Sequence, residues 1–85
     1  MERSIVKSLE ELKKICLNDY QDFYISLANG IARRSKEIMY NEEENTFSVF
    51  SGINGEFYEY CETQLFAHTN IIQAIEAGTL IHEKY

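Results

Sequence analysis

The chain has 85 residues, of which 45% are hydrophobic and 13% aromatic, a composition that suits one globular domain (residues 1–85) and excludes a disordered chain. Its formal net charge of −6 at pH 7 argues against a broad basic surface for nucleic acid or for an anionic membrane. There is no apolar run of about 18 residues and no apolar signal segment, so we expect a cytoplasmic protein that contacts no membrane.

A capping box marks the first predicted helix. Ser8 supplies a hydroxyl for the amide of Glu11, and Glu11 is positioned to reach back toward the cap, so a helix is expected to begin at Leu9. Asn18 and Asp19 are expected to end it. The residues before Ser8 fit either a backward extension of this helix or an extended arm.

After the first predicted helix, hydrophobic residues recur at every second position, which is typical of strands with one buried face. Two Asn-Gly pairs, at 29–30 and 54–55, are strong hairpin signals, and the polar run 41–45 separates two further apolar segments. Four strands of an antiparallel meander are therefore predicted, at roughly 22–28, 33–40, 46–53 and 56–61.

The register of the first hairpin is less simple. A strict two-residue turn at Asn29-Gly30 would pair Phe23 with Lys36 and Ile25 with Arg34, and would place two cations on the apolar face. We therefore expect a bulge or a longer loop at this turn.

The second hairpin raises no such conflict. A two-residue turn at Asn54-Gly55 pairs Val49 with Tyr60 and Ser51 with Tyr58, on a face that is apolar. This is the predicted register.

The C-terminal third is predicted to be helical. Residues 63–67 fit a short helical turn, Asn70 and Gln73 form a second capping box, and Gly78 ends the helix that follows. Residues 79–81 fit either an extended piece at the sheet edge or a loose tail. The predicted fold class is α+β: a four-stranded antiparallel β-meander with the N-terminal and C-terminal helices packed on one face.

Catalytic and metal sites are not expected. Cys16, Cys61, His68 and His82 are scattered singly, without the short spacings of a zinc site, and nothing would orient His68 as a base for Cys61. The four glycines match no phosphate loop. We therefore expect no enzyme activity, no cofactor, no metal and no small-molecule substrate.

A basic cluster offers one route to nucleic acid. Arg33, Arg34 and Lys36, together with Tyr24 or Tyr40, could contact phosphates and stack a base. Because the chain is acidic overall, such a footprint would be very local. Nucleic-acid binding is kept as the alternative function.

The acidic residues are sorted along the chain. From residue 37 to residue 83 there are nine Asp or Glu and no Lys or Arg, whereas residues 1–36 hold seven basic and five acidic side chains. Such a charged half can steer the protein toward a partner with a basic surface. The expected contact residues are Glu42, Glu43, Glu44, Glu56, Glu59 and Glu62.

Several segments together resemble a family of short uncharacterised phage and prophage proteins of low-GC Gram-positive bacteria. They are residues 22–27, 34–36, 69–72 and 74–78. The resemblance carries no catalytic residues. By analogy with small acidic phage products, it implies an accessory protein that binds a host protein and inhibits a nucleic-acid-processing defence complex such as a CRISPR effector. A phage structural or assembly factor is the third reading.

Overall fold

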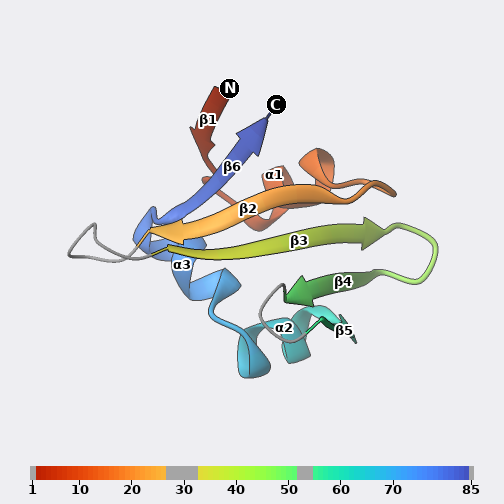
Figure 1. Ribbon diagram of the computed structural model, residues 1–85. Helices are drawn as coiled ribbons and strands as arrows, with labels where there is room; N and C mark the ends of the chain where they lie inside the picture. Colours follow the sequence, from red (N-terminus) through yellow and green to blue (C-terminus); the bar gives the residue numbers. More distant parts are fainter. Residues whose placement is uncertain (1, 27–32, 52–54, 85) are drawn as a thin grey trace.

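The computed structural model describes residues 2–26, 33–51 and 55–84, which form one six-stranded antiparallel sheet and three helices (Figure 1). Along the sheet the strand order is β1-β6-β2-β3-β4-β5. The strands are β1 (Glu2–Ile5), β2 (Gln21–Ser26), β3 (Arg33–Asn41), β4 (Thr46–Ser51), β5 (Glu56–Tyr60) and β6 (Leu80–Lys84). The helices are α1 (Leu9–Ile15), α2 (Glu62–His68) and α3 (Ile71–Ala77).

The α+β class is confirmed, but the predicted four-stranded meander is wrong because both chain ends add a strand. The C-terminal strand β6 inserts between β1 and β2, pairing Ile81 with Tyr24 on one side and with Ile5 on the other. The Val6 amide donates to the Leu80 carbonyl over 2.9 Å, and both side chains are fully buried. Residues 80–84 are thus an interior strand and not a tail.

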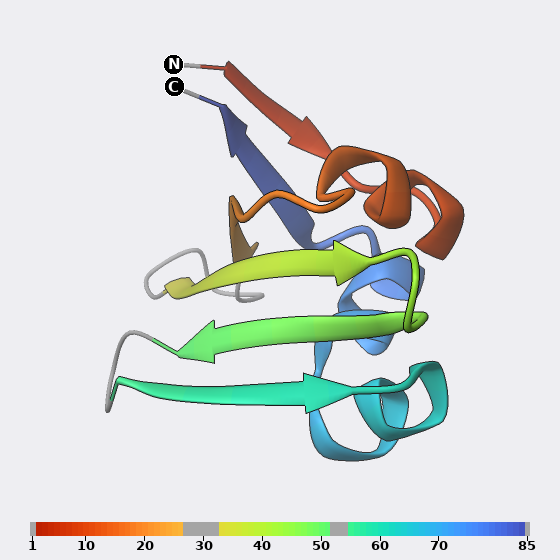
Figure 2. The same cartoon turned by 90° about the vertical axis from the view of Figure 1, so that its right-hand side faces the viewer.

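The helices cover one face of the sheet and leave the other open (Figure 2). Strand residues that alternate toward the helices form the core with apolar side chains of the three helices. The largest fully buried side chains are Phe23, Phe47, Leu12, Ile38, Leu65, Ile71, Leu80, Val6 and Cys16. The opposite face carries no helix and is called the open face below.

The three predicted helices form, but α1 ends at Ile15 and not at Asn18 and Asp19, and neither predicted capping box is complete. The Glu11 carboxylate accepts a hydrogen bond from the Lys7 amide over 3.4 Å, whereas a capping box needs the Ser8 amide. The Ser8 hydroxyl accepts a hydrogen bond from the Glu11 amide over 3.1 Å, which caps α1. Asn70 precedes α3 without a side-chain cap bond, and the Gln73 amide instead donates to a carbonyl of α2. Gly78 ends α3 with φ of 74°, a conformation that glycine adopts without steric cost.

The β2–β3 register is the one we argued against from the sequence. Phe23 pairs with Lys36 and Ile25 pairs with Arg34. Lys36 is tolerated because it is only half-buried, and a lysine stem can lie along apolar surface while its ammonium reaches water. The connection 27–32, where we expected a bulge, lies outside the described residues. As a consequence of this register, Asp22 faces a carboxylate on β3.

The β4–β5 register differs by two residues from the prediction. Val49 pairs with Tyr58, and Phe47 pairs with Tyr60. Because the shift is even, each side chain stays on its predicted face. The predicted turn residue Gly55 has φ of 70° and directly precedes β5.

Candidate functional site

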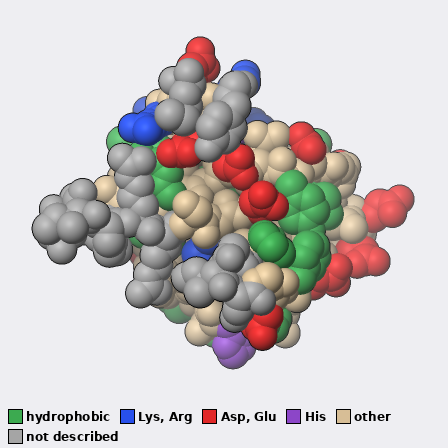
Figure 3. All heavy atoms as spheres, viewed as in Figure 1, with side chains coloured by type: hydrophobic (Ala, Val, Ile, Leu, Met, Phe, Trp, Pro, Cys, Tyr) green, Lys and Arg blue, Asp and Glu red, His purple; other side chains and the backbone are tan. Residues whose placement is uncertain are grey.

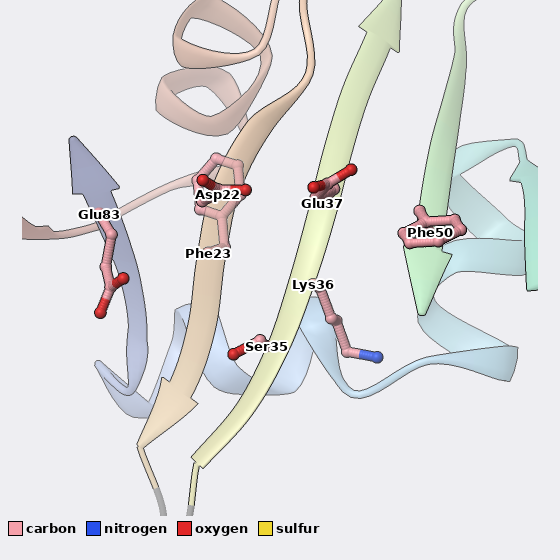
Figure 4. A pocket seen from close by; sticks show the side chains of 7 residues that line it. All are labelled: Asp22, Phe23, Ser35, Lys36, Glu37, Phe50 and Glu83. Carbon is pink, nitrogen blue, oxygen red and sulfur yellow. The ribbon is translucent and has the colours of Figure 1, made fainter. Parts of the chain in front are cut away.

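A single row of side chains crosses all six strands on the open face. Successive strand pairings place its members opposite one another, from the β1 edge to the β5 edge. They are Arg3, Glu83, Asp22, Glu37, Phe50 and Phe57. We call the three carboxylates of this row, Glu83, Asp22 and Glu37, the acidic row. Figure 4 shows them on three neighbouring strands, with Phe50 on the next.

The acidic row brings like charges together. Asp22 lies directly opposite Glu37 on one side and opposite Glu83 on the other. Like charges at directly opposed positions of an antiparallel pair destabilise a sheet. Arg3 compensates one end of the row, with its Nε 3.7 Å from Glu83 Oε1, but neither Asp22 nor Glu37 forms an ion pair with a described side chain. The two central carboxylates of the row therefore lie at directly opposed positions without an ion pair from the described side chains.

A shallow hollow of about 210 Å³ lies along the same row. Its lining combines three carboxylates with two phenyl rings, a serine and a lysine: Asp22, Phe23, Ser35, Lys36, Glu37, Phe50 and Glu83. Most of these residues belong to the open face, whereas Phe23 and Lys36 are paired on the helix-covered face. The hollow is of the size of one side chain and not of a large cofactor.

Aromatic side chains lie beside the acidic row. The rings of Phe50 and Phe57 are 6.1 Å apart, and Tyr20 packs against Phe57 at 5.7 Å. We call these three residues the aromatic patch. Phe57 is 54% exposed although it is large and apolar. On this face, carboxylates and hydrophobic side chains appear next to each other (Figure 3). The open face thus combines charge with apolar area, as protein-binding surfaces often do.

The glutamates predicted as contact residues do not form one surface. Glu42–Glu44 lie in the turn between β3 and β4, whereas Glu56 pairs with Ser51 at the other end of the β4–β5 hairpin. Glu59 lies opposite Ser48 on the open face.

Glu62 lies near a cation. It begins α2 and lies 3.9 Å from Lys13 Nζ, which also contacts Glu10 at 3.7 Å. The carboxylates of the acidic row were not among the predicted contact residues. The signal for two of them was present, since pairing Phe23 with Lys36 also pairs Asp22 with Glu37.

The residues proposed for nucleic acid are likewise divided. Tyr24 lies on the open face and Tyr40 on the helix-covered face, and each is only 8% exposed. The Tyr40 hydroxyl donates to Asn45 Oδ1 over 2.5 Å. Lys36 pairs with Phe23 on the helix-covered face, and the side chains of Arg33 and Arg34 lie outside the described part. The two tyrosines therefore offer no common stacking platform.

The cysteines and His68 do not form a reactive centre. The Cys16 thiol is buried and donates to the Leu12 carbonyl over 2.9 Å, and burial raises its pKa to about 12. Cys61 and His68 stand at opposite ends of α2, about 10 Å apart at the usual rise per residue. Within the described residues, no group of three or more His, Cys, Asp or Glu is arranged to hold a metal.

His82 is the one histidine that the sheet partly buries, and it makes the stability pH-dependent. Its Nε2 donates to Gln21 Oε1 over 3.1 Å. Burial lowers the pKa of His82, Lys84 lowers it further, and Asp22 opposes the shift. The unfolded chain therefore takes up this proton at a higher pH than the folded protein, near the ordinary value of about 6.5.

Acidification from pH 7.5 to 5.5 is therefore expected to lower the free energy of unfolding, because protonation of His82 favours the unfolded chain. Urea unfolding of the wild type and of His82→Gln at both pH values measures this effect. The decrease should be smaller in His82→Gln and unchanged in His68→Gln, which alters an exposed histidine. An unchanged decrease in His82→Gln would contradict the assignment to this ring.

Comparisons with protein-family models, with curated proteins and with solved structures give no match. No helix in the described part of the chain is both long enough and apolar enough to cross a membrane.

Proposed function

We propose that the protein is a small non-catalytic binding module whose open face attaches to a basic surface of another protein. The observation that carries this proposal is the position of Asp22 between Glu37 and Glu83. Folding alone gains nothing from this arrangement, because it opposes like charges on adjacent strands. A cationic side chain of the partner, placed over the row, would attract all of these carboxylates. The repulsion between them would therefore be offset in the complex.

The two parts of the open face have different roles. The acidic row steers the approach of a basic partner and favours the correct orientation, effects that weaken as salt shortens the Debye length. The aromatic patch supplies apolar area that is buried on contact, and partly exposed rings of this kind often dominate interface energies. Affinity is therefore expected to depend on both.

The partner class that we propose is a nucleic-acid-binding protein of a bacterial host. Such proteins carry basic grooves that neutralise phosphates, and an acidic surface can occupy them. The resemblance to short phage proteins favours an inhibitor of a host defence complex, acting in the host cytoplasm. The capture experiment below identifies the partner.

A capture experiment followed by affinity measurements tests the proposal. The immobilised protein is exposed to bacterial lysate at about 0.05 M and 0.5 M salt, and the retained proteins are identified by mass spectrometry. The dissociation constant of the captured protein is then measured for the wild type, for Asp22→Asn and for the matched control Glu76→Gln. Glu76 is exposed on α3, away from the open face.

We expect Asp22→Asn to weaken binding about tenfold, equivalent to about 1.4 kcal/mol, and high salt to weaken it further. Glu76→Gln removes the same single charge and should leave the affinity within about twofold, because long-range charge alone is screened. Equal affinities for all three proteins would exclude the open face as the contact surface.

A further inference from the structure

The open face also indicates what kind of segment it receives, an inference that rests on the proposed function. We infer that the bound part of the partner is an α-helix lying across the strands β6, β2, β3 and β4. Its basic residues lie one turn apart, at positions i, i+4 and i+7, and an apolar residue follows at i+11. The acidic row faces the basic residues, and Phe50 faces the apolar one.

The orientation of the bound helix relative to the strands follows from the positions of the carboxylates on the open face. On the open face Asp22 is followed along β2 by Tyr24, and Glu37 is followed along β3 by Met39. In β6, Glu83 is preceded on the same face by Ile81. Carboxylates therefore repeat across the strands and not along them. A ligand parallel to the strands would meet a single carboxylate of the row, whereas one that crosses them meets all three.

The spacing distinguishes a helix from an extended ligand. Neighbouring strands are about 4.8 Å apart, so Glu83 and Phe50, three strands apart, are separated by about 14 Å. Side chains one turn apart on a helix are about 5–6 Å from each other, and i to i+11 spans about 16 Å. Four residues on the same side of an extended chain would span about 20 Å, compared with about 14 Å for the row. The offset between ligand side chains and row residues would therefore increase from each strand to the next.

The length of the contact is limited by sheet twist. Adjacent strands rotate by about 20–25° relative to each other, so a straight helix cannot follow all six. Four strands match the extent of the hollow, whose lining runs from Glu83 to Phe50. Phe57 lies one strand further, on β5, and its ring packs against Tyr20, which directly precedes β2.

The hollow favours arginine over lysine at the central position. A guanidinium is planar and can donate to two carboxylates at once, and Asp22 and Glu37 are directly opposed across β2 and β3. An ammonium is a compact charge that cannot bridge the pair in this way.

Synthetic peptides test the inference without the natural partner. The first is an Ala/Gln peptide of about 16 residues, held helical by a lactam bridge on its far side, with Arg at i, i+4 and i+7 and Leu at i+11. The second has the same composition and bridge, but its three Arg residues are distributed around the helix. The third replaces the central Arg of the first by Lys. Binding is measured by fluorescence anisotropy at about 0.05 M and 0.15 M salt.

We expect the patterned peptide to bind at least about tenfold tighter than the scrambled one, and the Lys peptide to bind more weakly than the patterned one. Glu37→Gln should abolish the preference for the patterned peptide, and Glu76→Gln should preserve it. Equal affinities of the patterned and scrambled peptides would overturn the helix inference. If both peptides bound equally well and Asp22→Asn weakened the binding of both, the helix inference would be wrong and the proposed function would stand. If Asp22→Asn left the binding of both peptides unchanged, the result would count against the helix inference and against the proposed function.

Discussion

Leu80→Ala is expected to lower the free energy of unfolding by about 2–5 kcal/mol, because it opens a cavity where the C-terminal strand enters the core. Leu80 is fully buried on the helix-covered face, where it pairs with Ile25. Its carbonyl accepts the Val6 amide that leads into α1. Loss of the Leu80 side chain should therefore also weaken the packing of the N-terminal strand. Urea unfolding followed by circular dichroism measures the change.

Ile81→Ala is the matched control for this prediction. Ile81 is the next residue of β6, is of the same size and lies on the open face, where it is only partly buried. Its truncation should cost clearly less than that of Leu80. If the two variants lowered the free energy of unfolding equally, β6 would not place Leu80 in the core. If neither variant lowered it, the C-terminal strand would not contribute to stability.

The parts of the fold that could be predicted from the sequence are those encoded by local signals. Ser8 and Gly78 mark helix ends through hydrogen bonding and backbone conformation that involve only neighbouring residues. The strands β2 to β5 follow from hydrophobic alternation and turn residues. In contrast, β1 and β6 are short, lie at opposite ends of the chain and pair with each other, for example Ser4 with His82. No local pattern specifies a pairing between residues so far apart in the sequence.

The candidate site was missed for a related reason. We treated Lys36 opposite Phe23 as a conflict and therefore rejected the pairing that puts Asp22 opposite Glu37. A half-buried lysine removes the conflict, because its stem and its charge occupy different environments. Glu83 could not have been added, because its place beside Asp22 depends on β6. Runs of acidic residues were visible in the sequence, but rows across strands become visible only when the register is known.

The acidic row implies a trade between stability and binding. Sites that act on a partner often retain arrangements that weaken the fold, and relieving them stabilises the protein at the expense of function. Stability and affinity should therefore respond in opposite directions when the central charge is changed.

Asp22→Lys is expected to show this opposition most clearly. The new cation would lie between Glu37 and Glu83, so two repulsive cross-strand pairs become attractive, each worth about 0.2–1 kcal/mol. The free energy of unfolding should rise by about 1 kcal/mol at low salt, and the gain should fade as salt is added. Affinity for the basic partner should fall about 100-fold, because like charges facing each other across an interface cost several kcal/mol.

The unfolding of the variants is measured at pH 7.5, so that protonation of His82 does not contribute. Affinity is measured both for the captured protein and for the patterned peptide. Glu76→Lys makes the same change in net charge on α3 and is the matched control. It should leave stability within about 0.5 kcal/mol of the wild type and weaken binding much less than Asp22→Lys does. If Asp22→Lys destabilised the fold, the like-charge contact would be wrong. If it stabilised the fold but bound the partner normally, the acidic row would be a structural feature without a role in recognition, because a reversed charge at the centre of an interface cannot be neutral.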